Sequence, residues 1–174
     1  MRALIQHLET LDQRWSMALR VDDHRSSKAI ATVAAHFGDG PLWLVLWVAG
    51  AAYFAPPQRW RILLWLGASI LAAVVTYSIK FWLKRPRPQE VDGFYSKGYD
   101  RHAFPSGHAT RMGTLPIFGA WIFPEYTVVF WFISLVCIWA RVALGVHYLG
   151  DVIVGWGIGA AISLMLILAA ASYV

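Results

Sequence analysis

Five apolar runs, separated by short polar segments, limit what this chain can fold into. They cover residues 41–55, 60–83, 107–123, 126–143 and 148–172. A helix needs about 20 apolar residues to cross the hydrocarbon core of a bilayer. The runs therefore predict an all-α fold, an integral membrane helical bundle with about five transmembrane helices, the first of them short.

The composition agrees with a membrane protein. Hydrophobic residues make up 58% of the chain and charged residues only 14%, whereas soluble domains are about half apolar and about a quarter charged. The length fits one bundle, so we expect residues 1–174 to form a single domain. The net charge of +5 comes from basic residues beside the apolar runs. We therefore expect membrane lipids and an anionic substrate as partners, and no nucleic acid.

The first 38 residues are more polar than the rest. Within residues 2–20, apolar side chains recur at helical spacing, which predicts an amphipathic helix in the membrane interface. Residues 28–37 form a short apolar helix that is too short to cross a bilayer, so we expect it to be interfacial or re-entrant. The predicted division is interfacial helices over 1–38 and a transmembrane core over 39–174. Residues 1–25 lack the apolar core of a cleavable signal peptide, and we expect none.

A first polar cluster follows the second apolar run, from Lys80 to Pro88. It holds four cations, and its two prolines end the helix and extend the chain. A basic flank of this kind is also common beside ordinary transmembrane helices.

A second cluster, Phe104 to His108, opens the third run. Ser106 is a good N-cap, and the N–H groups of a helix start, with Gly107 allowing close approach, can bind an anion. His108 would then lie beside that anion and could donate a proton to a departing oxygen. A plain capped helix with an interfacial histidine explains this cluster equally well.

A third cluster, Arg141 to Asp151, joins the last two runs. His147 and Asp151 are four residues apart, which places them one turn apart on a continuous helix. A carboxylate behind an imidazole fixes its tautomer and leaves the other nitrogen free to react. Arg141 is off that face unless the chain bends at Gly145. A snorkelling arginine and an interfacial histidine are the ordinary alternative.

The number of crossings relates these clusters to one another. Five crossings place the long loop 84–104 and the third cluster on the same side of the membrane. Cations, backbone donors, a proton donor and a nucleophile with its carboxylate suit phosphoryl transfer, which needs positioning and charge neutralisation. Asp151 is the one carboxylate within the clusters, which argues against a two-metal site. We expect neither a metal nor a cofactor.

In order, Lys80-x6-Arg87-Pro88, Pro105-Ser106-Gly107-His108 and Arg141-x5-His147-x3-Asp151 resemble the three-part signature of the type 2 phosphatidic acid phosphatase superfamily, which are membrane lipid phosphatases. The spacing selects Arg87, not Arg85. The architecture is similar to that of the small bacterial undecaprenyl-diphosphate phosphatases in this superfamily.

The resemblance implies a role for each matching residue. His147 attacks phosphorus and forms a phosphohistidine, Asp151 orients His147, and His108 protonates the leaving oxygen. The phosphate would be held by Lys80, Arg87, Ser106, Gly107 and Arg141. Ala140 stands where the family usually has serine, which removes one donor and costs about 1 kcal/mol.

We therefore expect an enzyme, a lipid phosphate phosphatase. Undecaprenyl diphosphate, phosphatidylglycerol phosphate and phosphatidic acid all remain open as substrates. The alternatives are a lipid phosphotransferase using the same intermediate and a non-catalytic lipid-phosphate binder or transporter. The haloperoxidase branch of the family is soluble, which disfavours that activity here. The sequence leaves the oligomeric state open.

Two arguments about sidedness disagree. Basic residues within 1–28 would place the site in the cytoplasm. The resemblance implies the periplasmic or extracellular side of a bacterial inner membrane, and we favour it.

Overall fold

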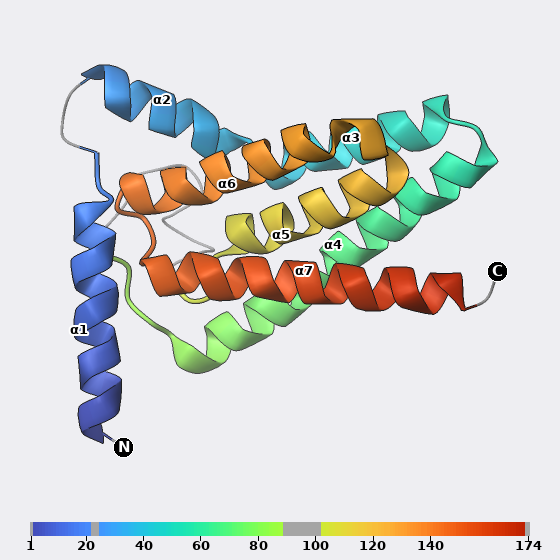
Figure 1. Ribbon diagram of the computed structural model, residues 1–174. Coiled ribbons are helices and arrows are strands. Elements are labelled where there is room, and N and C mark those ends of the chain that lie inside the picture. The colour runs from blue at the N-terminus through green and yellow to red at the C-terminus, as the bar shows by residue number, and fades with distance from the viewer. Residues whose placement is uncertain (1, 22–24, 89–101, 173–174) are drawn as a thin grey trace.

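This computed structural model describes residues 2–21, 25–88 and 102–172, and the structural statements below concern these residues. All regular structure among them is helical (Figure 1). In chain order the elements are α1 (Arg2–Ala18), α2 (Arg25–His36), α3 (Gly40–Tyr53), α4 (Pro56–Leu83), α5 (Gly107–Ile122), the 3-10 helix η1 (Pro124–Tyr126), α6 (Thr127–Ala143) and α7 (Leu149–Ala171). The predicted all-α membrane bundle is confirmed.

Three described segments are long and apolar enough to cross a membrane individually. They are α4, the joined η1 and α6, and α7, with mean hydropathies of 2.1, 1.8 and 2.3. The α2 and α3 helices together would make a fourth, as a span bent by 46° or as a re-entrant loop. The α5 helix has 16 residues, fewer than the roughly 20 of a full crossing. The number of five crossings therefore stays a prediction.

The α5 helix lies at the centre of the bundle, between α4, α6 and α7 (Figure 1). Its Met112, Leu115 and Phe118 are fully buried, and Phe118 stacks on Trp65 of α4 with ring centroids 6.1 Å apart. Several polar side chains inside the bundle are paired, and the indole nitrogen of Trp65, for example, donates to Thr114 at 2.8 Å. Pairing of this kind satisfies groups that would be costly to bury unpaired.

Glycines bring α5 and α7 into backbone contact. A Cβ added at Gly159 would overlap the carbonyl oxygen of Thr110, and one added at Gly113 would overlap that of Trp156. Small residues at such crossings let helices approach closely in membrane proteins. The close packing of α5 against α7 therefore depends on glycine at these positions.

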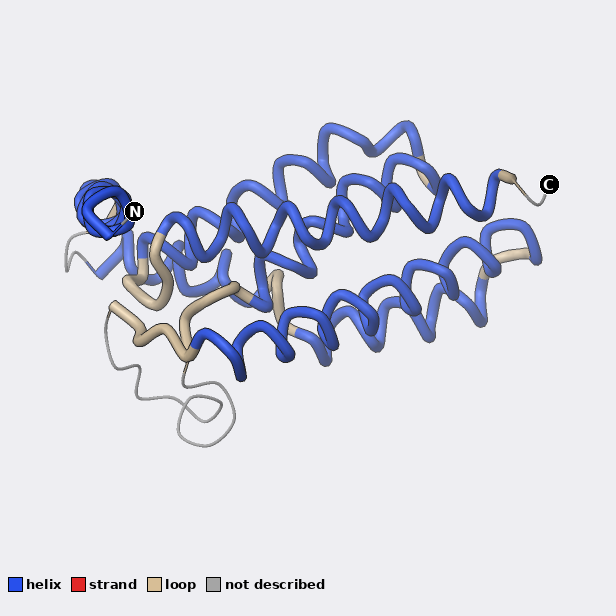
Figure 2. Tube along the Cα trace, turned by 90° about the horizontal axis from the view of Figure 1, so that it is seen from below, coloured by secondary structure: helices blue, strands red, loops and turns tan. Residues whose placement is uncertain are grey.

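The α1 helix runs across one end of the bundle, nearly perpendicular to the long helices (Figure 1), and Figure 2 shows it end-on. Leu4, Leu8 and Trp15 on it are more than half exposed. A helix perpendicular to the spans with an exposed apolar stripe has the geometry of an interfacial helix. This agrees with the amphipathic helix predicted over residues 2–20.

Candidate active site

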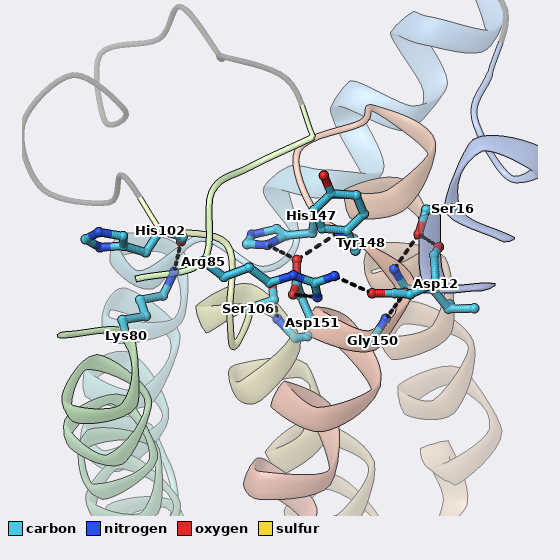
Figure 3. A network of polar contacts seen from close by, with 12 residues as sticks. Asp12, Ser16, Lys80, Arg85, His102, Ser106, His147, Tyr148, Gly150 and Asp151 are labelled. Carbon is cyan, nitrogen blue, oxygen red and sulfur yellow. Dashed lines mark hydrogen bonds and ion pairs between the residues drawn. The ribbon is translucent and has the colours of Figure 1, made fainter. Parts of the chain in front are cut away.

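The three polar clusters of the sequence meet at one end of the bundle. The end of α4, the start of α5 and the junction of α6 with α7 lie together beside α1 (Figure 1). Figure 3 shows Lys80, Ser106, His147 and Asp151 at this end. The predicted convergence of distant stretches is therefore present in the structure.

His147 lies in the turn before α7. The α6 helix ends at Ala143, and the chain reverses through Gly145, whose φ of 68° is left-handed and suits glycine. The predicted bend at Gly145 is confirmed, and it joins the backbone of His147 to that of Arg141 through a 3.2 Å hydrogen bond. The continuous helix from His147 to Asp151 was wrong, because α7 begins only at Leu149.

The two side chains nevertheless meet. His147 Nδ1 lies 3.6 Å from Asp151 Oδ2, and both side chains are buried. The backbone N–H of Tyr148 donates to the same oxygen at 2.8 Å. Asp151 thus closes the first turn of α7 while its carboxylate faces the imidazole, and a carboxylate in this position fixes the tautomer of a histidine.

Arg85 binds the other oxygen of this carboxylate. Its Nη1 donates to Asp151 Oδ1 at 2.7 Å, and its Nη2 donates to Asp12 Oδ2 of α1 at 2.7 Å (Figure 3). Its guanidinium also lies 4.3 Å from the centroid of the Tyr148 ring. Burial opposes the charge of Arg85, but the two ion pairs outweigh it and raise the pKa of this side chain above its usual value.

The preference for Arg87 over Arg85 therefore missed a residue of the site. Arg87 is half-buried and its predicted phosphate contact stays a prediction. The sequence contains an Arg-Pro dipeptide twice, Arg85-Pro86 and Arg87-Pro88. This repetition was the one sequence signal that could have indicated both arginines as residues of the site.

Lys80 is buried at the end of α4, and its ammonium donates to the carbonyl of His102 at 2.7 Å. It is close enough to act electrostatically on Asp151. The backbone N–H of Ala103 also binds the carbonyl of Arg85 at 2.8 Å. These contacts bring the end of α4 against the segment that leads into α5.

Ser106 caps α5 as predicted. Its Oγ accepts from the N–H of Ala109 at 3.4 Å, and its own N–H binds the carbonyl of Asp151 at 3.0 Å. Gly155 permits this contact, because a Cβ there would lie 2.6 Å from the carbonyl oxygen of Ser106. A Cβ at Gly107 would meet nothing within 4 Å, so the backbone at the start of α5 has open space beside it.

His108 faces the break between α2 and α3. Its Nε2 lies 2.9 Å from Asp39 Oδ1, and Asp39 Oδ2 lies 2.7 Å from His36 Nδ1. Arg111 donates to the carbonyl of Gly38 in the same break, and Arg141 acts electrostatically on His108. Asp39 makes no side-chain cap hydrogen bond at the start of α3 and pairs with two imidazoles.

A pocket of about 300 Å³ opens beside the nucleophile candidate. It lies between α1, the α6–α7 junction and the end of the first cluster. Its lining residues are Gln13, Ser16, Met17, Arg20, Pro88, Val142, Gly145, His147 and Tyr148. His147 contributes to the wall of this pocket, and both of its ring nitrogens are buried.

Two further observations concern the chemistry of the site. Ala140 is fully buried in a cluster of alanines from α2 and α6. Within residues 2–21, 25–88 and 102–172, no group of three or more His, Cys, Asp or Glu side chains could hold a metal ion.

Two curated proteins are similar to part of this chain in sequence. A lipid A 1-phosphatase of Rhizobium johnstonii is 41% identical over 63 residues, which are 36% of this chain and 26% of that protein. One from Rhizobium etli is 40% identical over 63 residues, again 36% of this chain and 27% of that protein. The chain therefore aligns with only about a quarter of the length of these curated relatives.

Solved structures share the fold. A PAP2 type phosphatidylglycerolphosphate phosphatase from Bacillus subtilis gives a TM-score of 0.82 at 22% identity, covering 95% of this chain and 87% of that one. LpxE from Aquifex aeolicus gives 0.75 at 19% identity, covering 90% and 94%. The family model of the PAP2 superfamily matches residues 62–172, more than half of the chain and the whole stretch that holds the three clusters: the chain belongs to the PAP2 superfamily.

Proposed function

We propose that this protein is a membrane lipid phosphatase, which hydrolyses a phosphate ester or diphosphate of a lipid. The observation that carries the proposal is the buried pair of His147 and Asp151, 3.6 Å apart, at the bundle end that also holds Lys80 and the capped start of α5. An imidazole backed by a carboxylate, beside a lysine and the N–H groups of a helix start, has the parts that phosphoryl transfer needs.

In the first proposed step, His147 Nε2 attacks phosphorus. The P–N bond forms as the bond from phosphorus to the lipid oxygen breaks, and His108 gives its proton to that oxygen. Asp151 stabilises the positive charge that develops on the imidazole. The product of this step is a phosphohistidine and the free lipid alcohol, or the lipid monophosphate when the substrate is a diphosphate.

In the second proposed step, water attacks the phosphohistidine. His108 accepts a proton from the water, the P–N bond breaks, and inorganic phosphate leaves with neutral His147 restored. The negative charge on the phosphoryl oxygens would be neutralised throughout by Lys80, Arg87, Arg141, the Ser106 hydroxyl and the backbone N–H of Gly107. The mechanism requires no metal.

Within this proposal the substrate is a lipid phosphate, and which lipid carries the phosphate has to be determined by assay. Undecaprenyl diphosphate, phosphatidylglycerol phosphate and phosphatidic acid are the three candidates from the sequence. The names of the relatives add lipid A carrying a 1-phosphate. We further propose that residues 1–174 act as one domain, because α1 contributes to the site through Asp12.

A phosphate-release assay tests the proposal. Purified protein in mixed micelles should release inorganic phosphate from at least one of these four lipids in the presence of EDTA, and His147→Ala should abolish the release. Transfer of labelled phosphate to a lipid acceptor, without release, would indicate the phosphotransferase alternative. Lipid binding without turnover would indicate a binder, and turnover that survives His147→Ala would refute the histidine mechanism.

A further inference from the structure

We propose that Asp12 of α1 and Arg85 are positioning residues, which together hold the carboxylate of Asp151 in its orientation toward His147. Neither residue belongs to the three-part pattern by which the site is recognised. The inference rests on the proposed function, since it concerns the residue that orients the nucleophile.

Arg85 connects two carboxylates that come from opposite ends of the chain. One nitrogen binds Asp151 Oδ1 and the other binds Asp12 Oδ2, each at 2.7 Å. Asp151 is completely buried, and the Asp12 and Arg85 side chains retain only 16% and 24% of their exposure. Hydrogen bonds between charged groups in such surroundings are shorter and stronger than those between neutral groups, so the position of one carboxylate constrains the other.

The α1 helix also closes the start of α7. The N–H of Gly150 donates to Asp12 Oδ1 at 2.8 Å, and that of Leu149 donates to Ser16 Oγ at 2.8 Å (Figure 3). The first N–H groups of a helix have no partner within it, and here side chains more than 130 residues earlier in the chain supply the acceptors. Asp12 therefore fixes the turn that carries Asp151 as well as the guanidinium that binds it.

The two oxygens of Asp12 divide these tasks. Oδ1 accepts from the backbone of α7, while Oδ2 pairs with Arg85. An asparagine at this position keeps an oxygen for Gly150 and replaces the other with an N–H₂ group, which cannot pair with a guanidinium. Asp12→Asn thus separates the ion pair from the helix cap.

The consequence for Asp151 follows from its contacts. Its Oδ2 accepts a hydrogen bond from the backbone N–H of Tyr148 and faces His147, and its Oδ1 accepts a hydrogen bond from Arg85. Without Arg85 the carboxylate is tethered through one oxygen and can rotate away from the imidazole. Displacements of about 1 Å at a reacting group cost on the order of 100-fold in rate.

Single-turnover kinetics test the proposal, with enzyme in excess over the panel lipid that the wild type cleaves. Asp12→Asn and Arg85→Gln should each lower the rate constant by about 10- to 100-fold, and the double variant should lose little more than Arg85→Gln alone, because the two act through one contact chain. Glu9→Gln is the matched control: it removes the same charge from an exposed position of α1 and should match the wild type.

The rate constant is read separately from the amplitude, since partial unfolding lowers the amplitude and leaves the rate constant unchanged. Inhibition by inorganic phosphate should also be unchanged, because Asp12 and Arg85 do not touch the anion in the proposed arrangement. Weaker phosphate inhibition in Arg85→Gln would make Arg85 a phosphate-binding residue and overturn the inference. A rate constant in Asp12→Asn equal to that of Glu9→Gln would overturn it too.

Failure of the proposed function looks different. A wild type that releases no phosphate, or a His147→Ala variant that still does, refutes the phosphatase mechanism before any Asp12 or Arg85 variant is compared.

Discussion

Asp39 Oδ1 lies 2.9 Å from His108 Nε2. The two residues belong to different parts of the fold, because Asp39 lies in the break between α2 and α3 and His108 lies in the first turn of α5. Gly38 makes the approach possible, because a Cβ at that position would lie 2.6 Å from the His108 ring. A carboxylate on one ring nitrogen fixes the orientation of an imidazole and leaves the other nitrogen to exchange protons. The site therefore contains two carboxylate–imidazole pairs, one for each histidine of the proposed mechanism.

Asp39→Asn should slow the reaction by misorienting the proposed acid. We expect a loss of about 10-fold or more with a lipid alkoxide as leaving group, since general acid catalysis contributes about 100- to 10,000-fold. The loss should shrink with 4-nitrophenyl phosphate, whose leaving group needs little protonation. His36→Gln is the control, because His36 contacts the same carboxylate but is largely exposed. An equal loss of rate with both substrates would show that His108, oriented by Asp39, is not the general acid.

The proposed nucleophile predicts a covalent intermediate on one named residue. Brief incubation with a lipid carrying a ³²P-phosphoryl group, followed by quenching in alkali, should leave label on the protein that survives base and is lost in acid, as a phosphoramidate is. His147→Ala should carry none. In Asp151→Asn the rate of labelling should fall by about 10,000-fold, as for other imidazoles that lose their orienting carboxylate. Label retained in His147→Ala would assign the nucleophile elsewhere.

The side of the membrane that holds the site can be measured at described positions. Lys84, at the exposed end of α4 beside the site, becomes a reporter in Lys84→Cys. Pro57→Cys reports the opposite end of the same helix. The native Cys137 is fully buried and contributes little background. In intact cells, a membrane-impermeant maleimide should label Lys84→Cys and spare Pro57→Cys if the site faces outward. The reverse pattern would place the site in the cytoplasm, as the basic residues near the N-terminus favour.

Much of the bundle could be predicted because its determinants are local. Apolar run length predicted both ends of α6 and α7 and the end of α4 to within one residue, and the Ser106 cap located the start of α5. The α4 helix begins earlier than the predicted run, at Pro56. The His147–Asp151 pair was also found from spacing alone, although the assumed continuous helix was wrong. Because the chain turns at Gly145, His147 reaches the carboxylate of Asp151 from outside α7. The predicted contact between the two side chains therefore forms although the backbone conformation differs from the predicted helix.

The contacts that complete the site could not be predicted in this way. Asp12 and Asp151 both bind Arg85, and Asp39 binds His108, but each pairing joins residues 66 or more positions apart. Hydrophobic periodicity is a local pattern and cannot predict which residues so far apart in sequence form a contact. An acidic residue on an amphipathic helix is usually solvated, and an aspartate between two glycines usually turns the chain. Only the packing of α1 and of the α2–α3 break against the bundle gives these two carboxylates their partners.

The crossing of α5 with α7 offers a stability prediction with an internal control. Gly159→Ala should lower the free energy of unfolding by about 1–3 kcal/mol, as overpacking typically does, because the added Cβ would overlap the backbone carbonyl of Thr110, which cannot move without shifting α5. Gly157→Ala, two residues earlier on the same helix, adds the same methyl where nothing lies within 4 Å. It should be neutral or stabilising, since alanine is the better helix former. Thermal unfolding of both variants in the same detergent measures the difference, and equal midpoints would show that α5 and α7 are not in backbone contact at this glycine.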